Sequence, residues 1–282
     1  MYRKLMFFVA ILALTTLACG FQVNVPRQME AGPDVTETIK IPYSAGGEDS
    51  LKLSFGAGEL KLSPGAGGLV DGTATYNYEQ FKPEVKTDGG NVHITMGETR
   101  INFLPSFDSL KNEWDLKLGG QPMDLSIESG AYEGDYEFGG LALTRLTVAD
   151  GAADVELSFS EPNPAEMTVF SYSTGASDIE MKNLANANFS LFDFSSGAGN
   201  YTLDFSGELQ RDASVKLTTG FSNLIVIVPD GIDAVVTVKS GASNVNAGSG
   251  WSQSGNVYKQ KGEGPTLTFV IEMGAGNLTL TR

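Results

Sequence analysis

Four carboxylates recur at matching positions of the sequence and are the first candidates for chemistry. Asp154 and Glu156 follow one Gly-Ala-small motif, and Asp178 and Glu180 follow the next motif at the same offsets. Stacked carboxylates could bind Ca²⁺, and a pair of them could act on a sugar. Later motifs carry Asn in the first of these places, so the negative row fades to neutral. We therefore interpret the four carboxylates as turn residues of a repeat.

Histidine and cysteine each occur once. His93 lies in an alternating run on the face opposite Val92 and Ile94, which predicts a solvent-facing strand residue. Cys19 is the only thiol, so a zinc or iron site of His and Cys ligands is excluded by inventory. No Ser-His-Asp or Cys-His nucleophile can be assigned either. We predict no metal, no cofactor and no enzymatic activity.

An insert at residues 248–262 concentrates aromatic and basic side chains in an otherwise acidic protein. It holds Trp251, Tyr258, Lys259 and Lys261. One interpretation is a contact patch for a glycan or a partner protein. The other is a hairpin that folds Trp251 and Tyr258 over the end of a repeat stack, because the ends of stacked repeats need covers.

The elements that must position these residues are strands joined at a repeated glycine corner. Steps of 21 to 24 residues, and a last step of 33, separate the leading glycines Gly130, Gly151, Gly175, Gly197, Gly220, Gly241 and Gly274. Small corner residues suit coils that stack at ~4.8 Å, and a near-constant step marks a repeat architecture. We predict an all-β fold, a β-solenoid with one motif per coil. Antiparallel hairpins in a sandwich are the alternative. Phe221 breaks the small-residue rule, which predicts a bulge or a gap at that corner.

Residues 36–120 differ from the regular repeats after them and are predicted to form a separate N-terminal β domain. Strand-like runs cover residues 36–41, 51–55, 59–62, 72–78 and 91–96, and residues 88–90 (Asp-Gly-Gly) signal a tight turn. Residues 55–59 resemble an isolated first copy of the glycine corner. Residues 105–113 break the pattern and are the expected joint to the β-solenoid domain at 121–282.

The N-terminus has the features of a bacterial lipoprotein signal. Residues 1–18 combine Arg3 and Lys4 with a short apolar stretch and end at Thr-Leu-Ala before Cys19, which resembles a lipobox. Residues 19–35 are polar, carry two prolines and are predicted to be a tether. We expect lipidation of Cys19 and a location on the extracytoplasmic face of a bacterial membrane. The alternative is an ordinary secretory signal with an incidental cysteine.

Charge and composition exclude some classes of partner. The net charge is −15, which argues against nucleic acid and against electrostatic docking on anionic lipid. Hydrophobic residues make up 41% of the chain, which is enough for a buried core.

Several segments are similar to the toast-rack proteins, β-solenoid domains of bacterial and archaeal envelopes. The segments are residues 114–118, 122–131, 162–164, 188–189 and 197–207, with Trp251 and Tyr258; residues 55–60 and 82–85 resemble the N-terminal toast-rack domain. The resemblance implies a LiaF-like or adhesin-like solenoid without a catalytic residue set. LiaF-type members work with transmembrane helices and a sensor kinase, whereas this chain has a predicted lipid anchor instead.

These observations predict a non-catalytic, lipid-anchored cell-envelope lipoprotein that acts as an interaction or adhesin-like scaffold. Its expected partners are the membrane, through the anchor, and a cell-wall glycan or envelope protein; open strand edges would also allow self-association. Two alternatives stay open. One is a regulatory module of the response to cell-wall antibiotics, and the other is a carboxylate-dependent, glycan-active enzyme.

Overall fold

The computed structural model describes residues 28–47, 49–97, 104–105 and 109–282. This part of the chain is all-β, as predicted, and its helical elements are the two 3₁₀ turns η1 (Glu79–Phe81) and η2 (Leu184–Ala187). The predicted signal peptide and Cys19 lie outside the described residues. Within those residues, no helix has the length and apolar character needed to cross a membrane.

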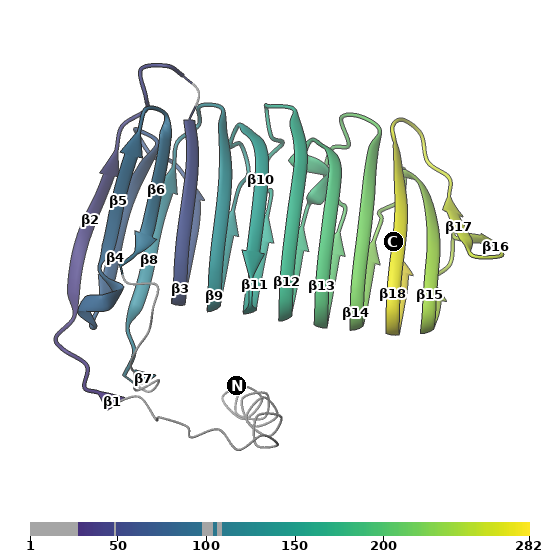
Figure 1. The fold of residues 1–282 in the computed structure, drawn as a ribbon. Coiled ribbons are helices and arrows are strands. Elements are labelled where there is room, and N and C mark those ends of the chain that lie inside the picture. Colours follow the sequence, from purple (N-terminus) through teal and green to yellow (C-terminus); the bar gives the residue numbers. More distant parts are fainter. Residues whose placement is uncertain (1–27, 48, 98–103, 106–108) are drawn as a thin grey trace.

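The strands stand side by side in an elongated row (Figure 1). Two short strands of two residues each, β1 (Gln28–Met29) and β7 (Leu104–Pro105), pair in parallel with each other and lie apart from this row. The other strands are β2 (Val35–Ile41), β3 (Asp49–Pro64), β4 (Val70–Tyr76), β5 (Pro83–Asp88), β6 (Asn91–Met96), β8 (Asn112–Leu118), β9 (Met123–Glu137), β10 (Leu143–Asp150), β11 (Ala152–Ser158), β12 (Met167–Lys182), β13 (Phe189–Asp204), β14 (Ala213–Ile227), β15 (Asp233–Ala247), β16 (Ser252–Ser254), β17 (Val257–Gln260) and β18 (Thr266–Thr281).

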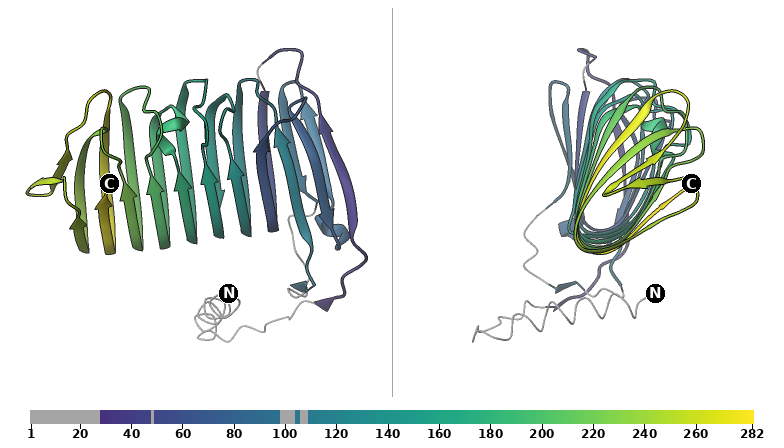
Figure 2. Two further views of the ribbon diagram at one scale, coloured as in Figure 1. Left: turned by 180° about the vertical axis from the view of Figure 1, so that it is seen from behind. Right: turned by 90° about the vertical axis from the view of Figure 1, so that its right-hand side faces the viewer.

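Each long strand turns back on itself at its corner glycine, so it has a first half and a second half that face each other (Figure 2). Neighbouring long strands pair in parallel through both halves. The predicted column of glycine corners is present. A Cβ built on Gly197 would lie 2.4 Å from the carbonyl oxygen of Gly175, so the backbones approach too closely for any larger residue.

The core fills the space between the two halves. Alternate residues point inward, and equivalent inward positions form apolar columns through the stack. In β14, for example, Val215 and Leu217 of the first half and Leu224 and Val226 of the second half are 0–1% exposed. Because only inward positions must be apolar, the outward positions are free to carry other chemistry.

The spatial order of the coils differs from their order in the sequence at the C-terminal end. Stacking in sequence order would place β15 on β14, and this expectation is wrong, because β18 lies between them. The 33-residue last step explains the difference. After β15 the chain forms the hairpin β16–β17 and then returns to fill the place next to β14.

The glycine corner at residues 55–59 is not an isolated copy, as the sequence suggested, but part of the column. Strand β3 pairs with β9 in parallel from Asp49↔Met123 to Leu62↔Tyr136. On its other side, the first half of β3 pairs in parallel with β6, and its second half pairs in parallel with β8. The predicted tight turn at residues 88–90 is confirmed, because β5 and β6 pair antiparallel across it.

The bulge or gap expected at Phe221 is absent. Phe221 stays in register between Ala198 and Ala275. Its side chain is 71% exposed, so the ring avoids its neighbours by pointing into solvent.

Candidate functional site

The outward face of the second halves carries seven carboxylates on adjacent strands. Equivalent residues lie in rows across the strands, with Asp154 beside Asp178 and Glu156 beside Glu180. The predicted stacking of these four residues is therefore confirmed. We define the acidic flank as the row Glu59, Glu133, Asp154 and Asp178 together with the row Asp135, Glu156 and Glu180 on β3, β9, β11 and β12.

Sequence reasoning missed that Glu59, Glu133 and Asp135 join these rows. The signal was available, because Glu59 and Glu133 lie three residues after their corner glycines, as Asp154 and Asp178 do. The strand of Glu59 was assigned to a different domain, so its register with β9 was not considered.

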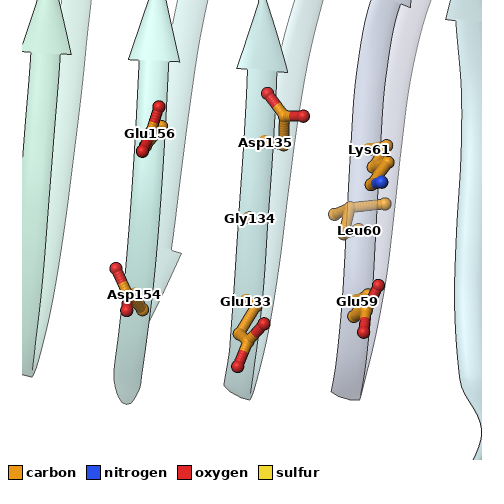
Figure 3. A pocket seen from close by; sticks show the side chains of 8 residues that line it. All are labelled: Glu59, Leu60, Lys61, Glu133, Gly134, Asp135, Asp154 and Glu156. Carbon is orange, nitrogen blue, oxygen red and sulfur yellow. The ribbon is translucent and has the colours of Figure 1, made fainter. Parts of the chain in front are cut away.

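A shallow hollow of about 370 Å³ lies on the acidic flank. Figure 3 shows its lining side chains, which come from β3, β9 and β11 and include Lys61 as the one basic residue among them. The lining carboxylates stand on neighbouring strands of one sheet surface (Figure 3). The hollow therefore offers a negative surface rather than an enclosed reaction chamber.

Burial and neighbouring charges shift the pKa of one carboxylate of the flank, and a lysine pairs with two others. The pKa of Asp154 is raised by its partial removal from water and by the negative charges of Asp178 and Glu156. Lys182 lies 3.3 Å from Glu180 and 3.6 Å from Glu156, but such exposed ion pairs contribute only ~0–1 kcal/mol each. The flank therefore keeps an excess of negative charge.

The first acidic row ends in an amide. Asn200 Nδ2 donates a hydrogen bond of 2.7 Å to Asp178 Oδ1, and the strands beyond β13 also carry Asn in this row. The neutral continuation predicted from the sequence is confirmed. The two rows of the flank are thus acidic over β3 to β12 and neutral over β13, β14, β18 and β15.

The arrangement favours attraction of cations over coordination chemistry. Among the described residues, no group of three or more His, Cys, Asp or Glu side chains is arranged to hold a metal ion. Rows of like charge attract positively charged groups through their summed potential. The chemistry that fits this surface is binding of basic groups.

A second polar cluster, which sequence reasoning missed, lies inside the corner of the stack. Asp150 accepts a hydrogen bond of 2.7 Å from the Tyr172 hydroxyl and longer ones, of 3.5 and 3.4 Å, from Tyr132 and Ser177. Burial raises the pKa of Asp150 above its ordinary value, while the hydroxyl donors oppose that shift. The cluster joins the two halves of the fold and is a structural feature of the corner.

His93 lies on β6, with Val92 and Ile94 pointing the other way as predicted. It is half-buried, and Ser54 Oγ lies 2.8 Å from its Nε2. Burial and the charge of Lys52 lower the pKa of His93. The sequence did not reveal this Ser–His contact, because the two residues are on different strands. The pair lies on an outward sheet face, and no described carboxylate is hydrogen-bonded to the ring.

The predicted patch around Trp251 forms part of the C-terminal end. Tyr258 of β17 is 6% exposed, lies opposite Val236 of β15, and accepts a hydrogen bond of 2.9 Å from Gln253 Nε2. Trp251 is half-buried against the core, whereas Lys259 and Lys261 are exposed. The hairpin thus covers the first half of β15. A role in contacting a partner stays a prediction for these residues.

The fold and site define an all-β repeat protein whose outward rows carry its surface chemistry. Residues 30–170, half of the chain, match the family model described as the N-terminal domain of toast_rack, DUF2154. The chain belongs to this toast-rack family, as the sequence resemblance implied. The matched region extends from β2 through β11 into β12, so it spans both the predicted joint at residues 105–113 and the predicted domain boundary after residue 120.

Several solved structures are similar to this chain. A "putative cell adhesion protein" from Clostridium sporogenes is 20% identical, with 88% of this chain and 98% of that chain covered and a TM-score of 0.47. A "putative adhesin" from Parabacteroides merdae is 9% identical, with 91% and 100% covered and a TM-score of 0.42. A "putative lipid binding protein" from Parabacteroides distasonis is 10% identical, with 89% and 99% covered and a TM-score of 0.36. No curated protein matches the sequence.

Proposed function

We propose that this protein is a non-catalytic, lipid-anchored lipoprotein of the bacterial cell envelope that acts as an adhesin-like interaction scaffold. In this proposal residues 1–18 are the signal peptide, Cys19 carries the lipid and residues 19–35 are the tether. The repeats form a β-solenoid at 121–282, preceded by the N-terminal β domain at 36–120. The rows of the outward face then engage a cell-wall glycan or an envelope protein.

The observation that supports a scaffold most directly is that inward and outward rows differ in how far their residue types vary. Inward columns stay apolar, whereas one outward row changes from carboxylates at Glu59 and Asp178 to amides at Asn200 and Asn277. The backbone register is kept through this change, so the stack works as a stiff wall on which surface chemistry can vary. Such a wall suits extended contacts with a partner.

A non-catalytic role is supported by the form of the acidic flank. General acid and base catalysis needs a carboxyl group and its partner held around one substrate, in reach of the bond to be broken. The flank instead offers open rows on one sheet surface, with pairing to Lys182 at its edge.

The anchor is tested by comparing the full-length protein with its Cys19→Ala variant in a bacterial host supplied with a labelled fatty acid. We expect label and membrane association in the wild type and loss of both in the variant. Equal labelling or equal membrane association of the two proteins would reject the lipid anchor.

The scaffold role is tested by a pull-down from solubilised envelope fractions at low and moderate ionic strength. Retention of a defined envelope protein or wall fragment is the expected result. The scaffold hypothesis fails if nothing is retained under any ionic condition. Release of reducing sugars from wall material, lost on Asp154→Asn, would instead favour the glycan-active alternative.

A further inference from the structure

Equivalent positions in the repeats can be compared within this one chain. The residue after the corner glycine is Ala on the long strands β3, β9, β12, β13, β15 and β18, at Ala57, Ala131, Ala176, Ala198, Ala242 and Ala275. Strand β14 carries Phe221 in this place, and Phe221 is the most exposed large hydrophobic residue described. A departure at one coil, in a position that the fold keeps small elsewhere, calls for a separate explanation.

Two further outward positions of β14 depart from the repeat in the same direction. Ile225 lies in register between Thr202 and Thr279, and Ile227 is the next outward residue on the strand. Both are half-buried and point away from the core, because the intervening Val226 is fully buried. We call Phe221, Ile225 and Ile227 the β14 stripe.

The fold does not require the β14 stripe. Neighbouring coils build the same backbone with Ala beside Phe221, Thr beside Ile225, and Asp204 and Thr281 beside Ile227. Exposed aromatic and aliphatic side chains in one cluster promote association, and buried aromatic anchors supply much of the free energy of binding at interfaces. The stripe is therefore better explained as a contact surface than as part of the core.

Charge indicates what would cover the stripe. Asp178 and Glu180 lie on β12, two strands from β14, and the strand spacing places them ~10 Å away on the same outward face. The acidic flank continues from there to β9 and β3. Basic groups of a ligand seated on the stripe would meet these carboxylates, whereas an anionic polymer would be repelled.

We propose that the β14 stripe and the acidic flank together form one docking surface for a basic protein segment with an apolar anchor at one end. The proposal deepens the scaffold function and rests on it. The anchor covers Phe221 and Ile225, while lysine or arginine side chains lie over Asp178 and Asp154. From β14 to β9 is about four strand spacings, or ~19 Å, which ~13 residues of a helix or ~6 extended residues can span.

Two synthetic fluorescent peptides test the surface by anisotropy titration. One has six lysines followed by Leu-Phe-Leu, and the other has six lysines alone. With the wild-type protein we expect the apolar-tailed peptide to bind about tenfold more tightly, as burial of an aromatic anchor predicts. Both affinities should fall as salt increases.

Three variants separate the parts of the proposal. Phe221→Ala/Ile225→Thr/Ile227→Thr installs residues found in neighbouring coils and should remove the preference for the tailed peptide. Asp154→Asn/Asp178→Asn extends the natural Asn row and should weaken both peptides by about tenfold, consistent with loss of two charge contacts. Val169→Thr/Leu191→Ser, on the outward face of the first halves, is the matched control and should bind like the wild type.

The inference is overturned if the wild type shows no preference for the tailed peptide, or if the control variant loses that preference equally. Circular dichroism of each variant verifies that it is folded. Repeating the envelope pull-down with the stripe variant distinguishes the two proposals. No retention by any protein rejects the scaffold itself, whereas equal retention by wild type and stripe variant rejects only this surface.

Discussion

The two ends of the stack are covered in different ways. At the N-terminal end, β6 and β8 follow both halves of β3, and the antiparallel strands β5 and β4 lie outside them. At the C-terminal end, β17 pairs only with Ala234–Thr237 of β15. Residues 242–247 of β15 pair with β18 on one side and with no described strand on the other. One end is therefore closed over both halves, and the other over one.

The outermost strands also differ in charge. Strand β2 carries Glu37 and Lys40, and charged residues on an edge discourage pairing with another chain. The open edge at residues 242–247 carries no charged residue and no proline. The coils share one backbone pattern, so their local stability should depend on what covers them. The C-terminal end should open first on unfolding.

The largest expected effect concerns the two tryptophans, one at each end. Trp114 of β8 is 1% exposed and packs edge-on against Phe55, with 5.1 Å between the ring centroids, whereas Trp251 is half-buried. Trp114→Ala should lower the free energy of unfolding by about 3–5 kcal/mol, and Trp251→Ala by about 1–2 kcal/mol. Urea unfolding followed by far-UV circular dichroism measures both values.

The same two positions report on each end separately. In Trp251→Phe, fluorescence comes from Trp114 alone, and in Trp114→Phe it comes from Trp251 alone. We expect the Trp251 signal to change at a lower urea concentration than the Trp114 signal. Coincident transitions with equal losses for the two Ala variants would show that the ends are energetically equivalent.

The next largest effect is the loss of stability on Gly→Ala substitution, which should be greater at an inner corner than at the corner of the open end. In Gly197→Ala the new Cβ meets the Gly175 carbonyl oxygen at 2.4 Å between two fixed coils, which should cost about 2–4 kcal/mol. In Gly241→Ala the contact with Gly274 is 2.8 Å and the coil is free to shift outward, so about 1 kcal/mol is expected. Thermal unfolding measures the difference, with Gly120→Ala as a control in open space. Equal losses at Gly197 and Gly241 would mean that the end coil is as rigid as the interior.

Much of this fold could be predicted from the sequence, because its main constraint is local and repeated. Alternation marks the strands, and the small corner residues mark where backbones approach closely. The same reasoning placed Asp154 beside Asp178. The register of one coil on the next follows directly from the shared offsets to the glycine.

The order of the coils could not be predicted in the same way. Strands β15 and β18 both carry the motif, and both fit against β14 by pattern alone, so only packing of the whole chain decides which one lies there. The contacts of Asp150 with Tyr132 and of His93 with Ser54 join paired strands. They were missed because Asp150 precedes its corner glycine whereas Tyr132 follows its own, and because β6, which carries His93, has no glycine corner. Such contacts depend on distances between coils that no single motif contains.

A smaller effect comes from two buried amides, one near each end. Gln260 Nε2 donates to the carbonyl oxygens of Val228, Pro229 and Ile232, at 3.2, 2.8 and 3.1 Å. Asn112 Nδ2 donates at 2.6 Å to one carbonyl oxygen, that of Ala57.

Gln260→Leu leaves three carbonyl groups without that donor and should cost about 2–3 kcal/mol, against about 1 kcal/mol for Asn112→Leu. Chemical denaturation measures both. A larger loss for Asn112→Leu would contradict the view that the C-terminal end, where the hairpin packs, depends strongly on the Gln260 side chain.

The smallest expected effect is a pH dependence near the closed end. Burial raises the pKa of Asp150 above its ordinary value of 3.8. The native state therefore binds this proton more tightly than the unfolded chain, so the carboxyl group favours folding below pH 3.8 and loses that contribution as the pH rises through the folded-state pKa. Asp150→Asn should stabilise the protein slightly at about pH 7, and its advantage over the wild type should shrink toward about pH 4.

The position of Asp150 indicates which tryptophan signal should respond to the Asp150→Asn substitution. Its partner Tyr132 packs on Phe55 at 6.2 Å, and Phe55 packs on Trp114, so the effect should appear in the Trp114 signal before the Trp251 signal. Asp88→Asn, in the exposed turn between β5 and β6, is the matched control and should shift neither signal. An equal shift of both signals by Asp150→Asn would mean that the whole stack unfolds as one unit, and the contrast between its ends would then be limited to local opening in the native state.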